Sequence, residues 1–287
     1  MVNGKWLEVR ENEQSFFSFL SLRVFVDNFF MVIIALLSDF GTRDYFVGAM
    51  KGAILSINEG VHIIDITHEI EPQNVRSASF ALRACYKNFK VGTIFVAVVD
   101  PGVGSERRAI LVETDDYFFV APDNGLLGFV YNEAENFRVF ELTSHRFFAH
   151  QISRTFHGRD VFAPVAAHLS LGVKPDEFGN RIKDFVRLEE RRPRKIGESE
   201  IEAEIIEIDR FGNLITNLKR EDLPEKFALS IGETRIEKLR NFYAESQPDE
   251  IFMIFGSAGF LEIVAFRNSA KNLLNAAPMQ KIRVKSA

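Results

Sequence analysis

The feature that most constrains the fold is an uninterrupted apolar run, residues 93–99, which ends abruptly in a polar loop. Its β-branched and apolar residues are typical of a buried strand in a parallel sheet. Asp100 follows the strand directly, at the end where open α/β sheets place their ligands. Gly102 and Gly104 allow the loop to turn tightly and approach a ligand. Arg107 stands seven residues after Asp100, so the two side chains can pair across the loop.

Two other parts of the chain combine a strand and a polar loop with a following helix. Residues 32–37 predict a first strand, and residues 46–58 predict the helix that follows it. Asp39 and Asp44 lie in the loop between them, where carboxylates can accept hydrogen bonds from hydroxyls such as a ribose diol. The alternative is that one of them caps the helix. The same alternation continues with strands over 61–66, 109–114 and 117–120 and a helix over 75–86, which predicts an α/β fold.

His157 precedes a third predicted helix, over residues 161–171. A helix N-terminus lowers the pKa of an imidazole, and a neutral histidine can accept a proton from water. Together with Asp100 and Arg107 it forms a set that suits the activation of one water molecule. In this hypothesis Arg107 stabilises a developing hydroxide, Asp100 positions the arginine or the water, and His157 takes the proton. The alternative for His157 is a capping or packing role.

Composition excludes several classes of protein. The net charge is −5 over 287 residues, and acidic and basic residues are interspersed. This pattern does not predict the basic surface that binds nucleic acid. The single cysteine, Cys85, excludes an intrachain disulfide framework and favours a reducing, cytoplasmic location. The sequence contains no Walker loop, GxSxG, HExxH or CxxC pattern, and we expect neither a metal nor a cofactor. Arg23 and Asp27 interrupt the apolar stretch 16–37, which argues against a membrane helix.

The chain is predicted to divide into unequal parts. Residues 1–30 read as an N-terminal extension before a natural first strand, and residues 31–190 as an α/β domain. Residues 191–200 are charged and contain Pro193, which predicts a linker. Over 201–287 six or seven short strands follow one another, as in a small β-barrel or sandwich.

Seven stretches of the sequence, in this order, resemble the SAM hydroxide adenosyltransferases, the S-adenosyl-L-methionine (SAM) hydrolases related to fluorinase and chlorinase. The resemblance covers roughly residues 31–285 and leaves the extension 1–30 outside. The matching stretches are SDFGTRDYFVGAMKG (38–52), DITHEI (65–70), VDPGVGSERRAI (99–110), PDNG (122–125), TFHGRD (155–160), IDRFGNLITN (208–217) and GSAGFLEIV (256–264).

The resemblance implies a Rossmann-like, three-layer N-terminal domain, a C-terminal β-barrel, and a homotrimer with sites between subunits. It implies attack of water or hydroxide on C5′ of SAM, which releases adenosine and L-methionine. The sulfonium is already a good leaving group, so such an enzyme chiefly aligns and desolvates the nucleophile. Two alternatives stay open: cleavage of SAM by a halide, and a non-catalytic protein that binds adenosine or SAM.

The resemblance also assigns residues. The water-activating triad of the family falls on Asp100, Arg107 and His157, and the halogenases replace these positions, which favours hydroxide as the nucleophile. Phe46 stands where relatives often carry tyrosine. The remaining matches are Asp39 for the ribose, Asp209 and Ser257 for the methionine end, Asn213 with the backbone from Asn268 to Ala270 for the adenine, and Tyr243 as a stacking residue.

Overall fold

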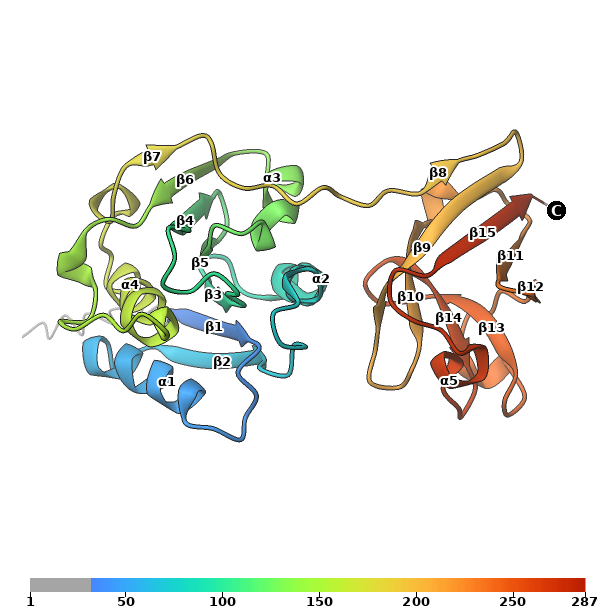
Figure 1. Ribbon diagram of the computed structural model, residues 1–287, viewed down its shortest axis with the longest axis horizontal. Coiled ribbons are helices and arrows are strands. Elements are labelled where there is room, and N and C mark those ends of the chain that lie inside the picture. The colour runs from blue at the N-terminus through green and yellow to red at the C-terminus, as the bar shows by residue number, and fades with distance from the viewer. Residues whose placement is uncertain (1–31, 287) are drawn as a thin grey trace, which may run out of the picture. The chain divides into compact units, whose positions relative to one another are not determined.

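The computed structural model describes residues 32–286, and the predicted extension 1–30 lies outside them. These residues belong to one compact unit with a mixed α/β fold that contains two large sheets (Figure 1). Among them, no helix is both long and apolar enough to cross a bilayer. The predicted division into domains at residues 191–200 stays a prediction.

The first sheet has seven strands and is mixed. Four neighbouring strands run parallel, and three antiparallel strands complete the sheet at one edge. The parallel strands are β2 (His62–Thr67), β1 (Ile33–Ser38), β3 (Ile94–Val98) and β5 (Phe118–Pro122), in that order, and the antiparallel strands are β4 (Ala109–Thr114), β6 (Phe137–Glu141) and β7 (Arg181–Ile182).

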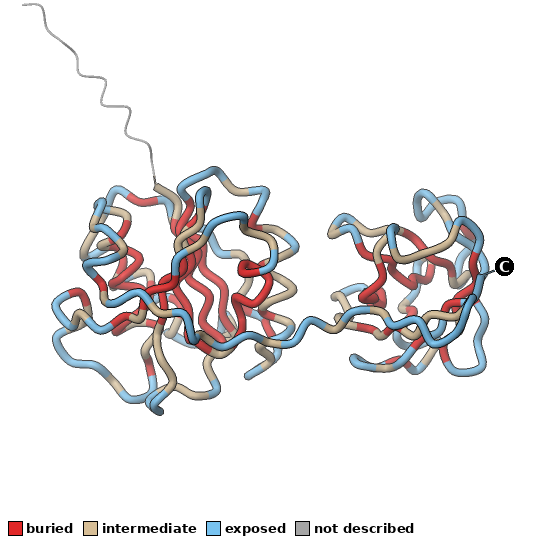
Figure 2. Tube along the Cα trace, turned by 90° about the horizontal axis from the view of Figure 1, so that it is seen from above, coloured by how far each residue is buried: buried red, intermediate tan, exposed pale blue. Residues whose placement is uncertain are grey.

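Helices cover both faces of this sheet. Successive residues of a strand point to opposite faces, so each buried strand contributes side chains to two core clusters. Ile34 and Leu36 of β1 pack in one core cluster, and Ala35 and Leu37 pack in the other. Figure 2 shows the buried strands at the centre of this layer arrangement. The first cluster contains residues of α1 (Phe46–Ile57) and α4 (Ala163–Ser170), and the second contains residues of α2 (Val75–Cys85) and α3 (Val130–Glu133).

The second sheet is antiparallel and nearly closes on itself. The segment after its first edge strand hydrogen-bonds to the other edge, from Met253 N to Lys238 O (2.8 Å) and from Arg240 N to Met253 O (2.9 Å). Closure of this kind protects strand edges and encloses an apolar core. In spatial order the strands are β12 (Thr234–Ile236), β11 (Phe227–Ile231), β15 (Lys281–Ser286), β9 (Glu200–Ile208), β10 (Leu214–Lys219), β14 (Phe260–Ala265) and β13 (Ile251–Phe255).

Two local features differ from the expectation. The charged segment predicted as a linker contains a short strand, β8 (Arg194–Lys195), which pairs with β9. The helix predicted over 161–171 begins earlier, with a π-helical turn at Gly158–Phe162 that leads into α4. Such turns within helices are frequent at functional sites.

Candidate active site

Asp100 and Arg107 pair across the loop after β3, as the sequence predicts. Arg107 Nε donates to Asp100 Oδ1 at 2.9 Å, and Arg107 Nη2 donates to Asp100 Oδ2. The side chains are nearly buried, with 5% of Asp100 and 11% of Arg107 exposed. Because both carboxylate oxygens are taken up by one guanidinium, the function of Asp100 in this geometry is to fix the plane of Arg107.

A close backbone approach holds this loop against the segment that carries His157. Gly104 has a φ of +76°, and a Cβ at this position would lie 2.1 Å from the Arg154 carbonyl oxygen. Only glycine tolerates both the left-handed conformation and this contact. The approach places the Asp100–Arg107 loop beside residues that lie about fifty positions later in the chain.

His157 completes the chain of hydrogen bonds. It precedes the π-helical turn, and its Nδ1 lies 2.7 Å from Arg107 Nη2. Because a guanidinium can only donate, Nδ1 must accept, and the proton of the neutral ring is therefore assigned to Nε2. Burial, and next the charge of Arg107, lower the pKa of His157 from its usual 6.5. The predicted lowering is confirmed, although burial rather than the helix terminus is its main cause.

Aromatic rings form an apolar wall next to His157. Phe156 packs edge-on against Phe46, with ring centroids 5.1 Å apart, and against Phe40 at 5.7 Å. Phe162 lies beneath the Arg107 guanidinium, with its ring centroid 5.4 Å from the guanidinium carbon. Phe46 therefore contributes packing where a tyrosine would bring a hydroxyl. Such a wall excludes water and strengthens electrostatic interactions within the site.

Asp39 lies at the same edge of the sheet as Asp100. The register pairs Ser38 of β1 with Val98 of β3, so the residues that follow these two parallel strands emerge together. Asp39 Oδ2 accepts a hydrogen bond of 2.8 Å from the backbone N–H of Gln73. Neither Asp39 nor Asp44 caps α1, because the N-cap residue is Tyr45 and no side chain caps that end.

A second group of predicted residues gathers on the other sheet, at the turn between β9 and β10. Asp209 Oδ1 accepts from the backbone N–H groups of Phe211 and Asn213, each at 2.9 Å. Asp209 Oδ2 accepts from Asn213 Nδ2 at 2.8 Å. Burial, and then the charges of Glu262 and Asp209, raise the pKa of the nearby Tyr243, while Asn213 lowers it.

The remaining predicted residues surround this second group. Ser257 is exposed in the turn between β13 and β14, and Asn268 donates to Asp249 Oδ1 at 2.8 Å. Ala270 is buried as the first residue of α5 (Ala270–Leu274), which the Lys271 N–H anchors to the Gly212 carbonyl at 2.9 Å. Within residues 32–286, no hydrogen bond or ion pair joins this group to the Asp100 group.

Two features were missed or left undecided by the sequence reasoning. Glu262 is a buried acid within the otherwise apolar strand β14, and this contrast was the available signal. His68, to which the sequence motifs assigned no role, is structural: it is 3% exposed, and its ring bonds to Ser38 Oγ (2.7 Å) and Asp65 Oδ1 (3.0 Å).

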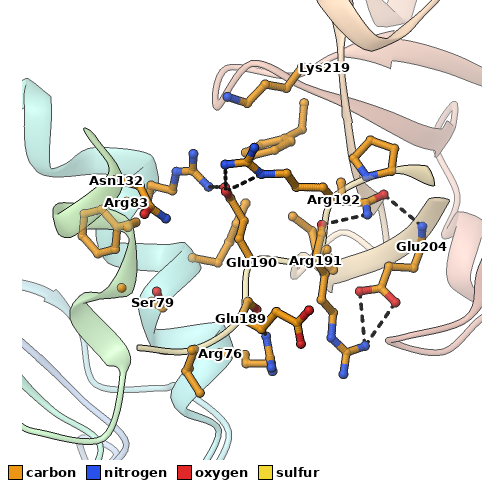
Figure 3. Close-up of a pocket in the computed structure, with 18 of the residues that line it drawn as sticks. Arg76, Ser79, Arg83, Asn132, Glu189, Glu190, Arg191, Arg192, Glu204 and Lys219 are labelled. Carbon is orange, nitrogen blue, oxygen red and sulfur yellow. Dashed lines mark hydrogen bonds and ion pairs between the residues drawn. The ribbon is translucent and has the colours of Figure 1, made fainter. Parts of the chain in front are cut away.

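A large cavity of about 760 Å³ lies elsewhere, and among its lining residues is none of the predicted site residues. Figure 3 shows that its charges neutralise one another: Arg83 pairs with Glu190 at 3.2 Å, and Arg191 pairs with Glu204 at 3.1 Å. Because its charged side chains already pair with one another, this cavity has few free charges to bind a charged ligand. The hydrogen-bonded residues Asp100, Arg107 and His157 are therefore the better candidate for an active site.

Comparison with known proteins adds independent information. The family model described as the SAM hydroxide adenosyltransferase N-terminal domain matches residues 34–179, and the model of its C-terminal domain matches residues 203–283. An (R)-S-adenosyl-L-methionine hydrolase of Methanocaldococcus jannaschii is 36% identical over 268 residues, which cover 88% of this chain and 95% of that protein.

More distant and structural relatives agree. A fluorinase of Nocardia brasiliensis is 29% identical over 226 residues, 70% of this chain and 75% of its own. The crystal structure of an uncharacterized conserved protein from Thermotoga maritima matches with a TM-score of 0.82 and 35% identity, and it covers 88% of this chain and 99% of that one.

Proposed function

Because the chain belongs to the SAM hydroxide adenosyltransferase family, we propose that it hydrolyses SAM to adenosine and L-methionine. The oxygen of water forms a bond to C5′, the C5′–sulfur bond breaks, and its electron pair leaves with the sulfur of methionine. One proton of the water passes to solvent. The observation that carries the proposal is the Asp100–Arg107–His157 chain beside an apolar wall.

The geometry suggests how these residues divide the work. Arg107 donates hydrogen bonds to Asp100 and His157, and its fixed positive charge favours a nucleophile with hydroxide character. His157 accepts from Arg107 at Nδ1, which leaves its Nε2–H free to orient the water. A proton reaches Nδ1 only when Arg107 moves away. The reaction needs no metal or cofactor, since the sulfonium leaves without further activation.

We propose that substrate binding uses both groups of residues, with Asp39 and Asp44 toward the ribose. Asn213, Tyr243, Asn268 and Ala270 would surround the adenine, and Asp209 and Ser257 the methionine end. The two groups lie on different sheets, and a homotrimer that brings the first group of one subunit to the second group of the next would complete the site. In this proposal the four parallel strands and their helices are a Rossmann-like core, the nearly closed sheet is a β-barrel, and the protein acts in the cytoplasm.

The test is product analysis with purified protein and SAM, with and without chloride. Adenosine and methionine in equal amounts, independent of chloride, are the expected result. A 5′-chloroadenosine product would instead indicate cleavage by halide, and SAM that is bound but unchanged would indicate a binding protein. Analytical ultracentrifugation tests the trimer, and a monomer with full activity would contradict the shared site.

A further inference from the structure

Glu262 is a buried carboxylate without a partner. It is 9% exposed, and every other residue of β14 is apolar and buried. Among the described residues, no hydrogen bond or ion pair reaches its side chain, and its strand neighbours across the sheet are Ile215 and Ile254. The Glu262 oxygens are not among the fully buried unpartnered atoms of the described residues, so a ligand from solvent can donate hydrogen bonds to them.

The surroundings increase this negative charge. Burial, and then the charge of Asp209, raise the pKa of Glu262, and Tyr243 lies within the field of both carboxylates. Both oxygens of Asp209 accept N–H groups of its own turn, whereas those of Glu262 accept none. The carboxylate oxygens that remain free to accept hydrogen bonds are therefore those of Glu262. The negative charges of Glu262 and Asp209 favour a cation there.

The backbone makes room for this carboxylate. A Cβ at position 256 would lie 1.7 Å from Glu262 Oε1, so the glycine at this position lets the side chain rest against the start of the β13–β14 turn. That turn carries Ser257, which is exposed, and Tyr243 is 43% exposed. The acceptor thus lies close to residues that a ligand from solvent can reach.

We infer that Glu262, in the negative field of Asp209, recognises a primary ammonium group and so determines specificity for the amino-acid end of the substrate. The inference rests on the proposed function, since SAM carries such an ammonium, and it assigns a role to a residue that the family resemblance left without one. An ammonium offers three N–H donors to the free oxygens of Glu262. A metal ion is a poorer match, because Ca²⁺ needs six or more oxygen ligands and Asp209 is already engaged.

Binding of SAM and of its deaminated 2-oxo analogue tests the inference by calorimetry. The Asp100→Asn protein serves as the parent, because its slower turnover depletes less SAM during the titration. The parent should bind SAM at least tenfold more tightly than the analogue. Adding Glu262→Gln should weaken SAM binding by about 10- to 100-fold, as expected for a lost charged hydrogen bond, and leave the analogue within about threefold.

Glu202→Gln is the matched control, because it removes the same charge from the same sheet, where Glu202 pairs with Lys281 at 3.0 Å. It should keep the preference for SAM. If Glu262→Gln weakened the binding of SAM and of the analogue equally, Glu262 would have a structural role and the inference would be overturned. A parent protein that bound SAM no more tightly than the analogue would also overturn it. Adenosine release by the unmodified protein is measured separately, so failure of the proposed function is recognised independently.

Discussion

Replacing Asp100 with asparagine tests the central geometry with almost no change in shape. Asp100 accepts two hydrogen bonds from Arg107, of which Nε to Oδ1 measures 2.9 Å. Asparagine keeps one acceptor for Nε but presents an NH₂ group to Nη2, so two donors face each other. The substitution therefore loosens the guanidinium that also holds His157 at 2.7 Å.

The magnitude follows from the hydrogen bond that is lost. A hydrogen bond between charged groups contributes about 1.5–3 kcal/mol, and each 1.36 kcal/mol in the barrier is a factor of ten in rate. If the placement of Arg107 matters mainly in the transition state, Asp100→Asn lowers kcat by about 10- to 150-fold. KM for SAM should stay within about threefold, because both oxygens of Asp100 face Arg107 rather than a ligand.

Initial rates of adenosine release over a range of SAM concentrations give both constants. The matched control is Asp123→Asn, since Asp123 is 5% exposed and forms the neighbouring pair with Arg108 (Nε to Oδ2, 3.0 Å). This control should lose stability in thermal unfolding and keep kcat within about threefold. An Asp100→Asn protein with unchanged kcat, or one whose loss appears only in KM, would refute the reasoning.

Three further results are expected. The folded protein lowers the pKa of His157, so the unfolded chain takes up a proton more readily than the folded chain does. The free energy of unfolding should therefore fall as the pH drops below 6.5, and it should fall less in Arg107→Met. Denaturant unfolding at a series of pH values measures this. Gly104→Ala should lower the free energy of unfolding by about 1–3 kcal/mol and reduce kcat. Gly92 has a similar φ but no atom near the position of an added Cβ, so Gly92→Ala should lower the free energy of unfolding by about 1 kcal/mol and keep kcat. Equal effects of the two substitutions would contradict the argument from the close backbone approach. SAM at a hundred times its Kd should stabilise the slow Asp100→Asn protein by about 2.7 kcal/mol, and an unchanged melting temperature would argue against SAM binding.

Much of the fold could be predicted because the relevant signals are local. Apolar runs bounded by polar loops located the strands and helices around Asp39 and Asp100, and parallel neighbours must end at one edge of the sheet. The two-residue strand β7 and the π-helical turn at Gly158–Phe162 carry no comparable periodicity. Pairing partners and packing, which lie elsewhere in the chain, determine such elements.

The sequence by itself determined the candidate triad, since Asp100 and Arg107 are close in the chain and the family resemblance adds His157. Only the tertiary structure decided which atoms meet: Arg107 donates to Nδ1 of a histidine fifty residues away, which sets the tautomer of that ring. It also decided that the charge of Asp209 raises the pKa of Glu262, and that no ion pair within residues 32–286 compensates this carboxylate. The physical reason is that hydrogen-bond geometry and the field around a buried charge depend on distances between remote segments, which the chain fixes only when it packs.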